Sequence, residues 1–294
     1  MVRTKNEMVI KESNDNYGVI IDLLNEINVE EESKGLQNSV YYALCACYFF
    51  VALIALVQLV RIQMRVPEFG WTTQKIFHLM NVLVNGLRAI LFGLYKIVFQ
   101  IRPHAVEIIL LDLPGLLFFS TYTLLVLFWA EIYHQARSIP ADRLRPIYYS
   151  VNGVVYLIQI IIWICMRIGR GHAALEAARL FFAVASFIAA SGFLIYGGRL
   201  FYMLRSFPIE SRGRQKKLYE VGCVTVICCT CFLVRCVVAA ISAFNEDIDV
   251  DVMDHPLANL LYYMVVEIVP SALVLFILRK LPPKRVSDQY HAIE

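Results

Sequence analysis

The chain has 294 residues, of which 59% are hydrophobic and only 17% are charged, and its mean hydropathy is +0.61. A water-soluble protein of this length needs more charged surface, so the composition excludes a soluble globular domain and predicts an integral membrane protein. The formal net charge of +3 is too small to indicate nucleic-acid binding.

Residues 1–38 precede the first long apolar stretch and are expected to form an N-terminal tail. Apolar residues recur at helical spacing from Val19 to Ile27, so a short amphipathic helix is expected within this tail. No cleaved signal peptide is expected, because the first membrane span can itself act as the targeting signal.

Seven apolar stretches follow, and each is long enough to cross about 30 Å of hydrocarbon as a helix of roughly 20 residues. In chain order they cover residues 39–60, 76–99, 106–130, 147–166, 175–197, 218–243 and 260–278. We therefore predict an all-α integral membrane protein, with a seven-helix transmembrane domain over residues 39–278. Residues 279–294 would form a C-terminal tail on the opposite side of the membrane from the N-terminus.

The distribution of Lys and Arg predicts which way this bundle faces. The N-terminal tail and the loops on its side hold seven of these residues, whereas the opposite loops and the C-terminal tail hold sixteen. Basic loops tend to stay in the cytosol, so we predict a lumenal N-terminus and a cytosolic C-terminus. The segment 244–259 agrees, because it holds five acidic residues and no Lys or Arg.

The second apolar stretch carries a stripe of polar side chains. If this stretch is a helix that turns 100° per residue, five polar side chains fall within an arc of about 80° around its axis. They are His78, Asn81, Asn85, Arg88 and Lys96. An arginine inside the membrane needs an acceptor, and Asp112 and Glu267 are the carboxylates at a plausible depth. We predict that Arg88 pairs with one of them, and Arg235 could also reach Glu267. This intramembrane polar network could either fix helix packing or line a pocket for a ligand or ion.

No pattern in the sequence indicates an enzyme, a cofactor or a metal site. The eight cysteines all fall within apolar stretches, and of the six histidines only His78 lies well inside one. The sequence contains no HExxH, phosphate-binding loop or nucleophile-elbow motif. We expect the cysteines to act as small apolar residues.

Seven spans with an external N-terminus are also the topology of rhodopsin-like receptors. Such receptors usually carry an acidic-Arg-Tyr triplet after the third span, where this chain has Glu131, Ile132 and Tyr133. A divergent seven-span receptor, or a small-solute transporter that uses the polar stripe as its pocket, is the alternative function.

Several long motifs resemble one family. They are RIQMRVPEFGWTTQK (61–75), LDLP (111–114), LLVLFWAEIYHQAR (124–137), YGGRLF (196–201) and LRKLPPKR (278–285). From about Ser39 to the C-terminus the chain closely resembles the plant tobamovirus multiplication protein family. The resemblance implies a vacuolar-membrane (tonoplast) host factor that binds the helicase-containing tobamovirus replication protein. It also implies that the protein tethers the viral RNA replication complex to this membrane and associates with an Arf-like small GTPase, without binding nucleic acid directly.

The basic loops 131–146 and 198–217 are the candidate surface for such cytosolic partners. The residues that form it are Arg137, Arg143, Arg145, Arg199, Arg205, Phe207, Arg212, Arg214, Lys216 and Lys217. The cations would attract an acidic partner, and Phe207 could supply an apolar anchor. The same charges could instead only enforce topology and contact anionic head groups.

The predicted orientation can be tested with a tag at each terminus on sealed vesicles. With the cytosolic face outward, protease should remove the C-terminal tag and spare the N-terminal tag, because sixteen basic residues against seven hold the C-terminal side in the cytosol. Digestion of the N-terminal tag alone would reverse the assigned orientation.

Overall fold

A computed structural model describes residues 34–64, 72–98, 104–168, 172–206, 212–244 and 256–279. All regular structure in these ranges is helical, and seven helices are long and apolar enough to cross a membrane. The predicted all-α, seven-span architecture is therefore confirmed, and the chain is a multi-pass membrane protein. The amphipathic helix expected at 19–27 lies outside the described residues.

The helices run in chain order as follows. The first spans Lys34–Met64, and α2 (Thr73–Gly93), α3 (Tyr95–Val98), α4 (His104–Ala136) and α5 (Leu144–Ile168) come next. The fifth span is continuous through α6 (His172–Gly192), the π-helical segment η1 (Phe193–Gly197) and α7 (Gly198–Ser206). They are followed by α8 (Arg212–Phe244), α9 (Pro256–Tyr263), the π-helical segment η2 (Met264–Ile268) and α10 (Val269–Ile277).

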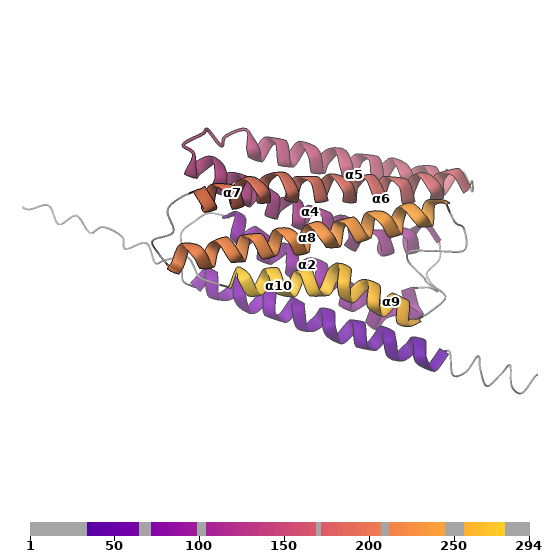
Figure 1. The fold of residues 1–294 in the computed structure, drawn as a ribbon. Helices are drawn as coiled ribbons and strands as arrows, with labels where there is room; N and C mark the ends of the chain where they lie inside the picture. The colour runs from indigo at the N-terminus through magenta and orange to yellow at the C-terminus, as the bar shows by residue number, and fades with distance from the viewer. Residues whose placement is uncertain are drawn as a thin grey trace, which may run out of the picture.

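These helices form an elongated bundle in which the long axes run side by side (Figure 1). The helix α6 packs along α8, α2 packs along α4, and α4 also contacts α5. The span within α4 is the most buried of the seven, and Leu116, Tyr122 and Leu125 on it are almost fully enclosed. The helix α4 is therefore the centre of the core.

The outer face of the bundle is apolar, as expected for a protein surrounded by lipid. Phe49 and Phe50 on the first helix, Leu157 and Ile161 on α5, and Phe187 on α6 are each at least half exposed. In water such a surface would be unfavourable by about 25 cal/mol per Å², whereas hydrocarbon tails make equivalent contacts with it.

The helices extend beyond the predicted apolar stretches, so the basic loops are shorter than expected. The chain between α4 and α5 is confined to residues 137–143, and most of the segment 198–217 is helical rather than loop. Hydropathy marks only the part of a helix that lies in hydrocarbon, while backbone hydrogen bonds can carry the helix further. In α7, burial of Leu200 and Met203 against the bundle adds a packing contribution.

Candidate functional site

The most concentrated group of buried polar side chains surrounds the carboxylate of Glu267 on η2. The hydroxyl of Tyr48 donates to Oε2 at 2.7 Å, and Arg88 donates from Nε to Oε2 at 3.0 Å and from Nη2 to Oε1 at 2.8 Å. From α8, Nη1 of Arg235 donates to Oε1 at 3.2 Å. Glu267 is 1% exposed, so these contacts form in the interior of the bundle and join the first helix, α2, α8 and η2. We call these four residues the Glu267 cluster.

The pairing of Arg88 with a carboxylate, predicted from the sequence, is present in the structure and its acceptor is Glu267. The approach of Arg235 to the same carboxylate is also present. The contribution of Tyr48 was not predicted, because a tyrosine in the middle of an apolar stretch gives no signal that it faces an acid. The bidentate Arg88 contact fixes the orientation of both side chains.

Asp112, the other candidate acceptor, binds a different helix. Its Oδ2 accepts from Nε2 of Gln159 at 3.1 Å and from the indole Nε1 of Trp163 at 2.8 Å, and both donors lie on α5. Asp112 therefore connects α4 to α5.

Of the remaining members of the predicted stripe, the two asparagines bond within α2 and the histidine also bonds to another helix. The amides of Asn81 and Asn85 donate to the carbonyls of Phe77 and Asn81, at 2.9 and 2.8 Å, within α2 itself. His78 is fully buried, and its ring nitrogens lie 2.8 Å from the Gln74 carbonyl oxygen and 3.0 Å from Oε1 of Gln58. The histidine thus connects α2 to the first helix, one part of the polar network that the sequence predicted.

The inclusion of Lys96 in the stripe was wrong. The helix α2 ends at Gly93, and Leu94 leaves helical geometry with φ −107° and ψ 20°, so a constant 100° per residue no longer holds beyond it. Lys96 lies on the separate short helix α3, is exposed, and places its ammonium 5.8 Å from the centre of the Tyr95 ring.

A local distortion of the seventh span presents Glu267 to its partners. Pro270 lacks an N–H and its ring crowds the preceding turn, so regular α-helical bonding cannot continue through it. Upstream, the N–H of Val269 donates to the carbonyl of Met264, five residues back, instead of that of Val265. The thiol of Cys231 on α8 donates to the Val265 carbonyl, with a sulfur-to-oxygen distance of 3.3 Å. The Cys231 thiol therefore donates to the carbonyl that loses its α-helical donor in the π-helical turn.

Aromatic rings and one glycine complete the surroundings of the two arginines. The guanidinium carbon of Arg88 lies 5.0 Å from the centre of the Tyr263 ring, and that of Arg235 lies 5.5 Å from the Phe118 ring. A side chain at Gly115 would place its Cβ only 2.8 Å from Nη2 of Arg235. With glycine at position 115, the guanidinium of Arg235 reaches α4 in this position without having to shift.

The cavities beside the arginines are small. One beside Arg88 encloses about 30 Å³ and is lined by Tyr41, Tyr95 and Tyr263, among others, and one beside Arg235 encloses about 10 Å³. A water molecule needs about 10–15 Å³ of such space, so these cavities suit one or two waters and not an organic solute. Across the described ranges, no three His, Cys, Asp or Glu side chains are arranged to hold a metal ion.

The predicted partner surface is described only in part. Arg137, Arg143, Arg145, Arg199 and Arg205 are exposed. Nε of Arg145 lies 2.9 Å from Oε1 of Glu131, whose Oε2 accepts from the Thr73 hydroxyl at 3.0 Å. Phe207 and the side chains of Arg212, Arg214, Lys216 and Lys217 lie outside the described residues.

Comparison with known proteins places this architecture in a family. Residues 22–294 match the sequence model of the THH1/TOM1/TOM3 domain. The chain belongs to the THH1/TOM1/TOM3 family. It is 65% identical over 263 residues to tobamovirus multiplication protein 1 of Arabidopsis thaliana, an alignment that covers 90% of both chains. To protein 1 of Nicotiana tabacum it is 62% identical, covering 89% of this chain and 91% of the relative.

A further member, tobamovirus multiplication protein 3 of Nicotiana tabacum, is 56% identical, with 89% of each chain covered. The resemblance seen in the sequence motifs is thereby confirmed. No solved structure matches the chain.

The Glu267 cluster should be a major source of stability. Glu267→Gln keeps the shape of the side chain but removes the only negative charge that Arg88 and Arg235 share in this cluster. Loss of one partner of a buried ion pair typically costs about 3–5 kcal/mol, so the variant should yield less folded protein and melt at lower temperature. Thermal unfolding of the detergent-purified protein, followed by size-exclusion chromatography, measures this. The control is Lys96→Gln at an exposed position of α3, and equal melting of the two variants would contradict a structural role for the cluster.

Cys231 should stabilise η2 through its hydrogen bond rather than through its size alone. Cys231→Ser retains a donor for the Val265 carbonyl, whereas Cys231→Ala leaves that carbonyl without it, at a cost of about 1–3 kcal/mol. The serine variant should therefore unfold at the higher temperature. The same pair of substitutions at partly buried Cys229 corrects for the intrinsic difference between Ser and Ala. If the Ser–Ala difference is the same at both positions, the proposed role of the thiol is wrong.

Proposed function

We propose that the protein is a membrane-anchored adaptor that serves as a host factor for tobamovirus multiplication. In this proposal it binds the helicase-containing viral replication protein from the cytosol and tethers the RNA replication complex to the vacuolar membrane. An Arf-like small GTPase would associate with the same face. The observation that carries the proposal is the 54–65% identity, over about 90% of the chain, to proteins named for tobamovirus multiplication.

The architecture suits an anchor. The Glu267 cluster holds the first helix, α2, α8 and η2 together, while Asp112 joins α4 to α5. Helices joined in this way can hold short connections in fixed relative positions. Binding to a rigid surface costs less conformational entropy than binding to a flexible surface, which must become ordered in the complex.

The connection between α4 and α5 presents the described part of the docking surface. Arg137 and Arg143 are exposed at this connection, and Ile139 beside them is 43% exposed. Exposed cations around an apolar residue are a composition that favours encounter with an acidic protein surface. The link from Glu131 to Thr73 and Arg145 connects the ends of α2, α4 and α5 next to this surface.

The spaces beside the two arginines do not suit the pocket that the transporter or receptor alternative places there. A drug-sized or metabolite-sized ligand is usually enclosed by a pocket of about 300–1,000 Å³. The spaces beside Arg88 and Arg235 are lined largely by aromatic rings and are far smaller. The proposal accordingly places no organic ligand beside Arg88 or Arg235.

Partner binding should depend on the basic connections and not on charge in general. We propose two variants in the predicted basic loops, and we call them the loop variants. They are Arg137→Gln/Arg143→Gln at the α4–α5 connection and Arg212→Gln/Arg214→Gln/Lys216→Gln/Lys217→Gln, which falls in the first turns of α8. Both keep the segments polar but weaken their positive field. Each should reduce co-purification of the viral replication protein by about 10-fold, because electrostatic attraction speeds encounter by roughly that factor or more. The measurement is co-purification from infected plant cells that express each variant at equal membrane level.

The matched control for the first variant is Lys96→Gln/Arg167→Gln. It removes the same number of charges from exposed positions on the side of the bundle predicted to be lumenal. Full recruitment by both loop variants at normal vacuolar-membrane levels would place the docking surface elsewhere. Equal loss in the control would show that overall charge matters, not these connections.

A further inference from the structure

The helix α7 has two chemically different faces. Leu200 and Met203 are 1% and 5% exposed and pack against the bundle, whereas Arg199, Tyr202 and Arg205 are exposed. At 100° per residue the three exposed residues lie within an arc of about 120° on one side of the helix. We call Arg199, Tyr202 and Arg205 the α7 face.

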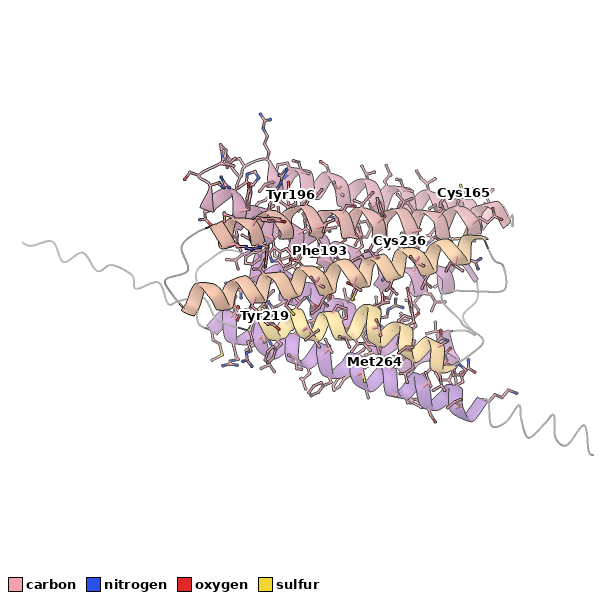
Figure 2. All side chains as sticks on the ribbon, in the orientation of Figure 1. Cys165, Phe193, Tyr196, Tyr219, Cys236 and Met264 are labelled. Atoms are coloured by element: carbon pink, nitrogen blue, oxygen red, sulfur yellow. The ribbon has the colours of Figure 1, made fainter. Side chains whose placement is uncertain are left out.

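This face lies where a membrane span ends. The span Glu176–Met203 runs through α6 and η1 into α7 without a break, so Arg199 and Tyr202 lie in its last turns and Arg205 lies just beyond its end. The next span begins at Tyr219 on α8, whose side chain is 76% exposed. Figure 2 shows Tyr219 at the same end of the bundle as α7. Exposed tyrosines are enriched at the level of lipid head groups, where the ring is in apolar surroundings and the hydroxyl is in water.

The arginines of the α7 face are not neutralised by the described part of the protein. Arg145 at the start of α5 has Glu131 as its partner at 2.9 Å. Among the described residues, neither Arg199 nor Arg205 forms an ion pair. An arginine at the end of a span extends its apolar stem along the helix and places its guanidinium at the membrane surface. The two cations are therefore positioned for an external anion at head-group depth.

We propose that the α7 face binds the phosphate of an anionic phospholipid head group. A guanidinium can donate two parallel hydrogen bonds to phosphate, which makes arginine better suited than lysine to this contact. Two exposed arginines that flank an exposed tyrosine at the end of a span favour a membrane lipid over a soluble anion, because the lipid phosphate is already held at this depth. This lipid site goes beyond the adaptor function and does not depend on it.

The test measures lipid bound to the purified protein in the absence of any viral component. The protein is reconstituted into nanodiscs of phosphatidylcholine with a minor fraction of phosphatidylserine, extracted in mild detergent, and its retained lipids are quantified by native mass spectrometry. The wild-type protein should retain phosphatidylserine over phosphatidylcholine. Each arginine near an anionic surface contributes about five-fold in affinity, so Arg199→Gln/Arg205→Gln should lower this preference about 25-fold.

Single variants and a matched control keep the result interpretable. Arg199→Gln and Arg205→Gln alone should each lower the preference about five-fold, so the test stands even if the double variant does not fold. The control Lys96→Gln/Arg167→Gln removes two exposed charges that belong neither to the α7 face nor to the docking surface, and it should leave the preference unchanged.

Three results would overturn the proposal. The first is a wild-type protein that shows no preference for phosphatidylserine. The second is a control variant that loses the preference as strongly as the double variant does. The third is complete displacement of the lipid by soluble glycerophosphoserine at a matched concentration. The last result would assign the site to a free phosphate ester. Lipid binding is measured without any viral component, so a negative result here says nothing about recruitment of the replication protein. The two proposals can therefore fail separately.

Discussion

The arrangement of the helices depends on one carboxylate that must be neutralised inside a membrane. An isolated charge in hydrocarbon is unfavourable by several kcal/mol, and Arg88 and Arg235 are equally unfavourable without an acceptor. Glu267 meets both arginines and also accepts from Tyr48. Each helix that supplies a donor is thereby fixed in depth and rotation relative to the seventh span. Apolar contacts alone do not provide this, because lipid tails pack against leucine as well as a neighbouring helix does.

Much of this arrangement follows from the sequence, for reasons that particular residues make clear. Span length and hydropathy predict the helices, since the hydrocarbon thickness fixes both. The high energy of a buried guanidinium predicts that Arg88 must meet a carboxylate, but depth alone does not distinguish Asp112 from Glu267. The choice depends on the rotation of α4, which directs Asp112 toward Gln159 and Trp163 on α5.

Other features had no signal in the sequence that could be read in isolation. Tyr48 lies among many apolar residues of the first helix, and only packing turns its hydroxyl toward Glu267. Lys96 was misplaced because periodicity assumes an unbroken helix. Gly93 directly precedes the break at Leu94, but a single glycine in an apolar stretch is compatible with a helix that continues as well as with one that ends. The helical character of 198–206 was missed because hydropathy registers charges such as Arg199 and Arg205 but not the burial of Leu200 and Met203 between them. Pro270 lacks the N–H that regular helical bonding needs, so an interruption before it follows from the residue type, whereas the π-helical form of that interruption does not.

That turn lets the seventh span hold one extra residue without changing how its two halves face the bundle. A π-helical turn contains one residue more than an α-helical turn, so Met264–Ile268 turns the chain about as far as one residue fewer of regular α-helix would. Tyr263, which lies against Arg88, and Ser271, which lies 3.3 Å from the Tyr122 hydroxyl, therefore keep the relative orientation of an uninterrupted helix. Loss of one residue from the turn would restore regular α-helical bonding and leave both of these contacts nearly in register, but it would redirect the side chains inside the turn, Glu267 among them. The extra residue thus sets the direction of the carboxylate separately from the packing of the rest of the span.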